Sequence, residues 1–380
     1  MLIVVLINFF LALATTISMA IMPLLMTEKM GLSILVFGLI EGSTEFLANV
    51  FKLVSGSVFD RIKNKKNIFV LSTFLASLSK LMFFFPTATT LLIARIFERL
   101  SNGLFSSPRD AFVGQVAKNR GLGLALLSCS KTLGCVAGPF LVSGMAFLFG
   151  DFNSQLNNLI ILGLSFAGLS VFMSFYIKTK TFVLKASKDF IFSDVLDVIR
   201  HIKPLLIITI FFFLGRFNDG LITIYLKKSG LPEWFYLSSI GFFNAVMFIV
   251  SPIIGLMVDG KKSFIAMLIT VFAIILCNFS FYSIDAMPMW LGSIGLITWG
   301  IQRVGAQIVF TSLIFKNIDQ KFYGTAIGVF SLICGIGNFI ASSICGHLAE
   351  NHFSYVFIYS GTSSIIALFL AFILAKKIRW

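Results

Sequence analysis

Twelve hydrophobic runs follow one another along this chain, and each is long enough to cross a lipid bilayer. A transmembrane helix needs about 20 apolar residues, and in lipid only helices and closed barrels satisfy their backbone polar groups. Because 58% of the residues are hydrophobic and only 12% are charged, the chain lacks the polar surface of a soluble protein. We therefore predict an all-α polytopic membrane protein. Its twelve transmembrane helices are expected at 2–26, 32–58, 68–85, 90–112, 122–149, 158–177, 205–226, 234–258, 264–283, 288–312, 323–347 and 354–375.

The loops between these runs carry most of the basic residues, but they share them unequally. Nineteen lysines and arginines lie in one alternate set of loops and three in the other. Cytoplasmic loops are the ones enriched in lysine and arginine. We therefore place both termini in the cytoplasm. The net charge of +14 reflects this topology, so we expect membrane lipid around the protein and no nucleic-acid partner.

The sequence shows no residue pattern typical of a cofactor or metal site. The five cysteines are an odd number without a C-x-x-C pair, and the three histidines are scattered. The sequence has no phosphate-binding G-x-x-x-x-G-K-[ST] loop. We expect no metal, no cofactor and no enzymatic activity.

The chain also contains an internal repeat. Gly56 and Asp60 end the second run and are followed by basic residues, and Gly255 and Asp259 end the eighth run in the same way. Parallel six-helix halves, with a substrate site between them, are a known transporter architecture. We predict two pseudo-symmetric six-helix halves and, between them, a cytoplasmic linker with an amphipathic helix. These domains are 1–177, 178–204 and 205–380.

Three motifs, in order along the chain, resemble signatures of the major facilitator superfamily. They are the loop Gly56–Lys66, the stretch Arg99-Leu-Ser-Asn-Gly103, and Gly134-x-x-x-Gly138-Pro139. Together with the spans and the repeat, the resemblance covers essentially the whole length. The stretches Glu41–Gly56 and Ser107–Asp110 are also similar to one poorly characterised bacterial branch of that family.

The resemblance implies a secondary active transporter with the fold of that family, acting as a monomer in the bacterial inner membrane. It also implies roles for the motif residues; the alternative is that the basic loop after Asp60 only determines topology. The implicated residues are, for a conformational latch, Gly56, Asp60, Arg61 and Asp259 and, for close helix packing, Gly134, Gly138 and Pro139.

Thirteen charged residues lie inside the predicted spans. Each costs about 2.5–3.5 kcal/mol at mid-membrane, so these side chains must face one another or a watery cavity. Glu41 and Glu45 are one helical turn apart, and two carboxylates that close repel each other when both are ionised. We predict that Glu41 and Glu45 carry protons and that Arg99 modulates them.

Basic groups outnumber acidic groups inside the spans, eight to five. A positively charged cavity favours an anionic substrate, and the arginine fork fits a carboxylate or phosphate. We predict proton-coupled transport of a small organic anion, such as a polycarboxylate or a carboxylate-type siderophore. The predicted substrate-binding residues are Arg95, Lys131, Arg216, Asp219, Arg303 and Gln307.

Structural roles remain open for several of these charges. Arg95 with Glu98, and Arg216 with Asp219, are three residues apart and are equally compatible with structural ion pairs. Lys80 is expected to be a structural partner. The alternative functions are proton-driven efflux of drugs or other lipophilic compounds, and a non-transporting membrane scaffold or sensor.

Overall fold

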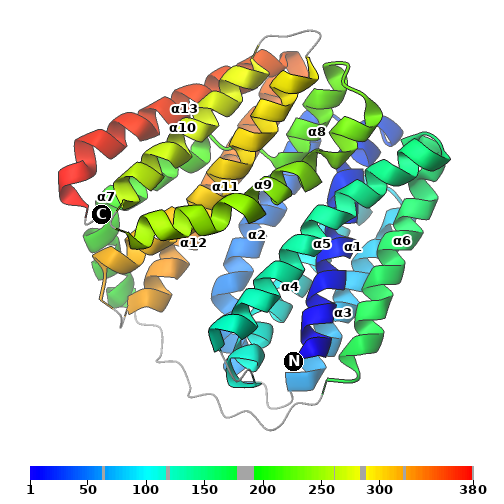
Figure 1. The fold of residues 1–380 in the computed structure, drawn as a ribbon, viewed down its shortest axis with the longest axis horizontal. Helices are drawn as coiled ribbons and strands as arrows, with labels where there is room; N and C mark the ends of the chain where they lie inside the picture. The colour runs from blue at the N-terminus through cyan, green and yellow to red at the C-terminus, as the bar shows by residue number, and fades with distance from the viewer. Residues whose placement is uncertain are drawn as a thin grey trace. The chain divides into compact units, whose positions relative to one another are not determined.

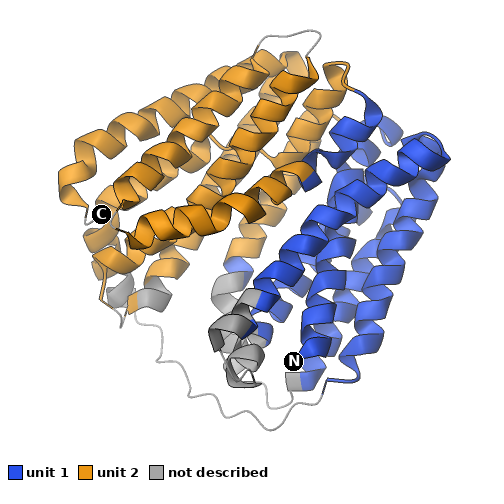
Figure 2. Ribbon diagram, in the orientation of Figure 1, with its two compact units in different colours: residues 1–32, 50–188, 232–241 blue, residues 33–49, 189–231, 242–380 orange. Residues whose placement is uncertain are grey.

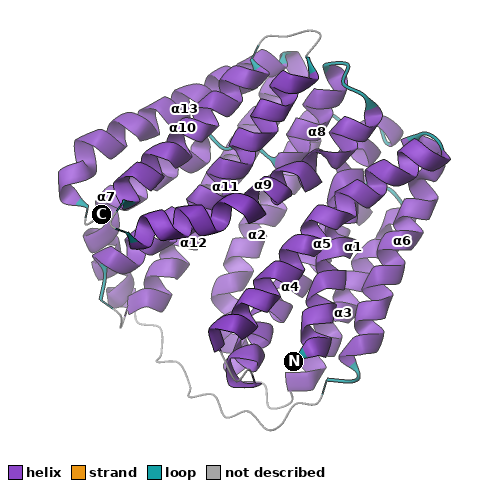
Figure 3. Cartoon of the chain, viewed as in Figure 1, coloured by secondary structure: helices purple, strands orange, loops and turns teal. Residues whose placement is uncertain are grey.

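The computed structural model describes residues 1–61, 65–116, 120–177, 192–260, 262–282, 288–319 and 322–378. These ranges form helices joined by short turns and contain no strand (Figures 1 and 3). The first helices are α1 (Leu2–Leu24), α2 (Ile34–Arg61), α3 (Lys65–Leu81), α4 (Ala88–Val116), α5 (Arg120–Phe149) and α6 (Phe152–Ser174). They are followed by α7 (Phe192–Leu214), α8 (Asp219–Lys228), α9 (Glu233–Asp259), α10 (Ser263–Phe281), α11 (Met289–Asn317), α12 (Tyr323–Asn351) and α13 (Phe353–Leu374). Short helical turns occupy Leu25–Lys29, Met82–Phe84 and Ala375–Lys377.

Each predicted span coincides with helical structure. In the part of the chain that the structure describes, ten helical segments are long and apolar enough to cross a membrane. The other two predicted spans are α4 and α11, which have 29 residues each and are therefore also long enough. Their charged and polar side chains lower their hydropathy. The prediction of an all-α polytopic membrane protein is confirmed.

The seventh predicted span is interrupted, although the sequence suggested one continuous helix. α7 ends at Leu214 and α8 begins at Asp219, so four residues lie outside both helices. The Ser360 hydroxyl donates to the Gly215 carbonyl, and the Asn218 Oδ1 accepts the Gly220 N–H at 2.7 Å as the N-cap of α8. These side chains satisfy backbone groups that a helix break in lipid would otherwise leave unpaired.

The first part of α7 covers most of the amphipathic segment predicted in the linker. The helix is continuous from Phe192, and its side chains Val198 and Ile202 are buried in an apolar cluster together with Leu205. The apolar face of this segment is therefore packed against protein. Residues 178–191 of the linker lie outside the described residues.

Two compact units divide the chain (Figure 2). Residues 33–49, the first part of α2, belong to unit 2, and residues 232–241, the start of α9, belong to unit 1. The division into sequence halves remains a prediction. Unit 1 consists of 1–32, 50–188 and 232–241, and unit 2 of 33–49, 189–231 and 242–380.

Glycines bring α1 and α5 of unit 1 close together. A Cβ atom on Gly134 would lie 2.6 Å from the Phe9 carbonyl oxygen, and one on Gly138 would lie 3.0 Å from the Leu13 carbonyl oxygen. The Thr16 hydroxyl donates to the Gly134 carbonyl at 3.2 Å. Small residues at such contacts let helix backbones approach and pack.

Replacing Gly138 by alanine should therefore destabilise the protein. We expect a loss of about 1–3 kcal/mol from overpacking against α1. Gly144 on the same helix is the matched control, because no atom lies within 4 Å of its added Cβ. Thermal unfolding in detergent measures both variants. Equal melting temperatures for G138A and G144A would contradict the packing role.

Candidate functional site

An ion pair in unit 2 links α8 to α11. Asp219 lies in the first turn of α8, and its Oδ2 contacts Nη1 of Arg303 on α11. The Trp299 Nε1–H donates to the other carboxylate oxygen, Oδ1, at 2.9 Å. The Arg303 guanidinium lies over the Phe243 ring, 5.3 Å from its centroid. The side chains of Arg303 and Asp219 remain 25% and 11% exposed, so this arginine is not sealed in the core.

Arg216 occupies the break between α7 and α8. Its guanidinium lies 5.7 Å from the centroid of the Phe213 ring, and it is close enough to Glu45 for their opposite charges to interact. The Nδ2 of Asn218 donates to Oε2 of Glu41 at 3.5 Å, a long hydrogen bond. The helix break therefore meets both glutamates that the sequence singles out.

Close packing of α2 against α12 fixes the helix that carries these glutamates. A Cβ on Gly38 would lie 3.2 Å from the Gly346 Cα, and one on Gly42 would lie 3.0 Å from the Ser342 Cβ. The Leu35 N–H donates to Oε1 of Glu350 at 3.1 Å. The backbones of these two helices are thus in near contact in unit 2.

Five charged side chains of unit 2 lie at the α7–α8 break or in the first turn of α8, or interact with a residue there, and we term them the charge cluster. It contains three carboxylates and two guanidinium groups drawn from α2, the α7–α8 break, α8 and α11. The cluster consists of Glu41, Glu45, Arg216, Asp219 and Arg303.

The ion pair within this cluster differs from the one suggested by sequence spacing. Arg216 and Asp219 would face each other on a continuous helix, because residues three apart share a helix face. The break places Arg216 outside the helix, and Asp219 pairs with Arg303 instead.

A second set of buried charges lies in unit 1. The Glu98 carboxylate accepts from Lys80 Nζ at 2.9 Å and from Arg95 Nη1 at 2.7 Å. All three side chains are only 2% exposed, so these pairs lie deep between α3 and α4. This geometry favours the structural alternative for Arg95 and Lys80. Arg99 on α4 is half-buried and lies near Glu98.

The other predicted site residues are more dispersed. Lys131 on α5 and Gln307 on α11 are exposed, and Asp259 is the exposed last residue of α9. Next to Asp259, the carbonyl of Val258 accepts a hydrogen bond from Lys316 at 3.1 Å. The surroundings of Gly56, Asp60 and Arg61 lie outside what the structure describes, so the latch remains a prediction.

Three residues of the site were not predicted from the sequence. Trp299, Asn218 and Phe243 carry no charge, so the cost of burying a charge did not single them out. The position of Trp299, one helical turn before Arg303, placed it on the same face. An asparagine directly before Asp219 is also a recognisable N-cap residue.

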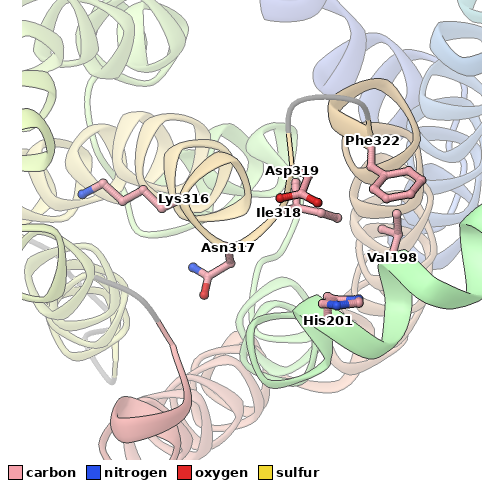
Figure 4. A pocket seen from close by; sticks show the side chains of 7 residues that line it. All are labelled: Val198, His201, Lys316, Asn317, Ile318, Asp319 and Phe322. Carbon is pink, nitrogen blue, oxygen red and sulfur yellow. The ribbon is translucent and has the colours of Figure 1, made fainter.

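Unit 2 also has a pocket away from the charge cluster (Figure 4). It lies at the start of α7, the end of α11 and the start of α12. The Lys316 ammonium group donates to Ser263 Oγ at 2.6 Å, so it is engaged with the start of α10. The pocket is lined by Val198, His201, Lys316, Asn317, Ile318, Asp319 and Phe322.

Helices of membrane-spanning length, with charged side chains gathered among them, define a polytopic membrane protein of the transporter type. The family model of the Major Facilitator Superfamily matches residues 4–342. The chain therefore belongs to this superfamily, as its motifs suggested, and it is an integral membrane protein and a secondary active transporter.

Relatives and solved structures agree with this assignment. The uncharacterized MFS-type transporter MJ1317 of Methanocaldococcus jannaschii is 24% identical over 372 residues, with 93% of this chain and 90% of that protein covered. The MFS-type transporter MJ1560 of the same organism is 26% identical over 363 residues, with 90% of each covered.

Among solved structures, a mutant of the nucleoside transporter NupG has a TM-score of 0.84 at 13% identity, with 100% of this chain and 99% of that chain covered. A POT family transporter in complex with 5-aminolevulinic acid has a TM-score of 0.79 at 13% identity, covering 99% and 96%. These structures share the fold.

Removing Glu98 alone should strongly destabilise the protein, because two buried cations would lose their shared carboxylate. We expect the E98L variant to lose about 3–5 kcal/mol. The triple variant K80M/R95M/E98L removes all three charges and should recover most of that loss. Thermal unfolding in detergent compares the two. If the triple variant is no more stable than E98L, the two unpaired buried cations are not the main cause of the loss of stability in E98L.

Proposed function

We propose that the protein couples the movement of a small organic anion to protons, with the charge cluster as its binding site. The observation that carries this proposal is a helix break that places the partly exposed Arg216 within electrostatic range of Glu45. At the same break Asn218 contacts Glu41, and Asp219 at the start of the next helix pairs with the partly exposed Arg303. Discontinuous helices form substrate and ion sites in many transporters. Alternating access of the fold would then carry the anion across the membrane.

The arginines determine the charge of the proposed substrate. Guanidinium groups bind carboxylates and phosphates through paired hydrogen bonds, and they remain charged at any physiological pH. Arg216 and Arg303 each lie over a phenylalanine ring, which limits the orientations of the guanidinium plane. Two such groups suit an anion with more than one acidic group. A polycarboxylate, including a carboxylate-type siderophore, therefore remains the proposed class.

The glutamates supply the proposed coupling to protons. Glu45 lies within electrostatic range of Arg216, and its negative charge competes with a substrate anion for the same guanidinium. A proton on Glu45 removes that competition, so proton binding and anion binding favour each other. Glu41 connects to the same break through the amide of Asn218. This linkage favours movement of the proton and the anion in the same direction.

The predicted topology, oligomeric state and remaining site residues are proposals as well. The unequal loop charges support the proposal that both termini are cytoplasmic, in a bacterial inner membrane. A monomer is sufficient for this fold. We also propose that Arg99 modulates proton binding and that Lys131 and Gln307 contact the substrate. Substitution of each residue tests its role.

Anions should stabilise the purified protein. We propose thermal-shift measurements with succinate, citrate, ferric citrate, glucose 6-phosphate and the lipophilic cation tetraphenylphosphonium. A ligand at about 100 times its dissociation constant stabilises by roughly 2.7 kcal/mol. The shift should disappear in R216A and R303A. It should persist in R200A, the matched control, because Arg200 pairs with Asp197 on an exposed face of α7. Stabilisation by tetraphenylphosphonium alone would favour drug efflux instead.

Neutralising the glutamates should uncouple transport from protons. In proteoliposomes with an inward pH gradient, the wild type should accumulate the stabilising anion. E45Q should lose this accumulation, because it cannot gain a proton, yet it should still exchange labelled for unlabelled anion. E41Q should show the same pattern more weakly, since Glu41 acts through Asn218. The control is E28Q, because Glu28 is exposed. Undiminished proton-driven accumulation by E41Q/E45Q would exclude these residues as carriers.

A further inference from the structure

One face of α10 is exposed and apolar along the length of the helix, and a lysine stands at its beginning. The exposed side chains recur every three or four residues, which is the spacing of a single helix face. In a helix that crosses a membrane, such a face lies against lipid, because lipid tails are as apolar as leucine. The face consists of Lys262, which directly precedes the helix, and of Ile265, Ile269, Phe272, Leu276 and Phe279.

The second half of α13 has a face of the same kind, and a lysine stands at its end. The turn that follows the helix is held in place, because the next residue, Ile378, is buried in the apolar cluster of unit 2. Lys377 in this turn is exposed as well. The exposed face consists of Ile365, Phe369, Phe372 and Ile373 and, in the turn, Lys376.

The lysines of the two faces lie at the same end of unit 2. α10 and α13 are side by side (Figure 1). The Phe264 ring at the start of α10 meets the Phe372 ring near the end of α13 edge-on, with centroids 5.7 Å apart. Further along, a Cβ on Gly361 of α13 would lie 3.9 Å from the Asn278 Cβ of α10. The two helices therefore run antiparallel, and the start of α10 adjoins the end of α13.

Other positive charge adds to these lysines. The Lys316 ammonium group donates to Oγ of Ser263, the first residue of α10, at 2.6 Å. The N-terminus of α10 contributes the partial positive charge of its helix dipole. The exposed carboxylates of Asp259 and Asp319 also lie near this end. They are outnumbered by the four lysines, so the end of these helices attracts an anion.

The three exposed lysines are available to such an anion. Lys262, Lys376 and Lys377 form no ion pair with any residue that the structure describes. A lysine beside an apolar helix face extends its ammonium group to the membrane interface, where the lipid head groups lie. Membrane topology alone requires basic residues in such loops, but it does not require them to meet where two neighbouring lipid-facing stripes end.

We propose that this surface binds an anionic phospholipid. The lipid phosphate lies among Lys262, Lys376 and Lys377, and the acyl chains follow the exposed faces of α10 and α13. An anion at one end of two apolar chains matches a positive end above two apolar stripes. The loop charges predict that this end is cytoplasmic, where basic pockets between transmembrane helices bind lipid head groups. The surface does not include the charge cluster, so the inference is independent of the proposed function.

Native mass spectrometry of the purified protein in detergent tests the proposal. The probes are dioleoyl phosphatidylglycerol and dioleoyl phosphatidylcholine, which has the same chains and no net charge. The wild type should bind phosphatidylglycerol more tightly than phosphatidylcholine. The K262Q/K376Q/K377Q variant should bind phosphatidylglycerol at least about tenfold more weakly, because each lysine near the membrane surface attracts anionic lipid. Only exposed side chains change, so the fold should be retained.

Two further variants separate the site from a general effect of charge. K262R/K376R/K377R keeps the three charges and should bind phosphatidylglycerol like the wild type. The matched control is K29Q/R200Q/K203Q, which removes three exposed basic side chains elsewhere and should also bind like the wild type.

Three results of these titrations would overturn the inference. They are equal affinity of the wild type for the two lipids, wild-type affinity for phosphatidylglycerol in the glutamine variant of the three lysines, and an equal loss of affinity in the matched control.

Photolabelling distinguishes a bound lipid from a free phosphate. Phosphatidylglycerol with a diazirine group in one acyl chain, added at about one molecule per protein, should label peptides of α10 and α13. Labelling of those peptides should fall several-fold in the glutamine variant, and sodium phosphate should not compete. Labelling spread evenly over the other helices would contradict the proposed site. Displacement of the lipid by sodium phosphate at the same concentration would show that the ligand is a free phosphate and would overturn the lipid assignment.

Discussion

The cost of an unpaired charge in a membrane is the constraint on which this structure depends. A charged side chain at the bilayer centre costs several kcal/mol, which is a large share of the free energy of unfolding of a typical domain. Glu98 meets this cost by joining Lys80 to Arg95 between α3 and α4, and Asp219 meets it by joining α8 to α11. Charges that a soluble protein would leave at its surface here determine which helices pack together.

The interrupted helix follows from the same constraint. A break in lipid leaves backbone groups without partners, and here side chains from neighbouring positions supply them. Ser360 binds the Gly215 carbonyl, and Asn218 caps α8 while it reaches Glu41. Because the break is held by polar side chains, it brings charged residues into an apolar interior. The structural need for partners and the proposed binding site are therefore served by the same segment.

Much of the fold was predictable, because span length and hydropathy are set by the bilayer rather than by tertiary contacts. Every predicted span falls on helical structure, and the motifs around Asp60, Arg99 and Pro139 indicated the family. The break at Gly215 was not predicted, because a glycine within an apolar run has no unique meaning until the opposing helix is known. The same reasoning failed for Arg216, whose spacing from Asp219 has structural meaning only on an unbroken helix.

The sequence by itself determined the helices, the unequal distribution of charge among the loops and the residues that could not face lipid. Those properties depend on composition and on distance along the chain. Only the tertiary structure decided the partners: Glu98 for Arg95, Arg303 for Asp219, and Trp299 for the second oxygen of Asp219. Partner choice depends on which helices touch and at what rotation. Those features are fixed by close contacts such as Gly38 and Gly42 against α12 and Gly300 against α9, which leave no periodic signal in the sequence.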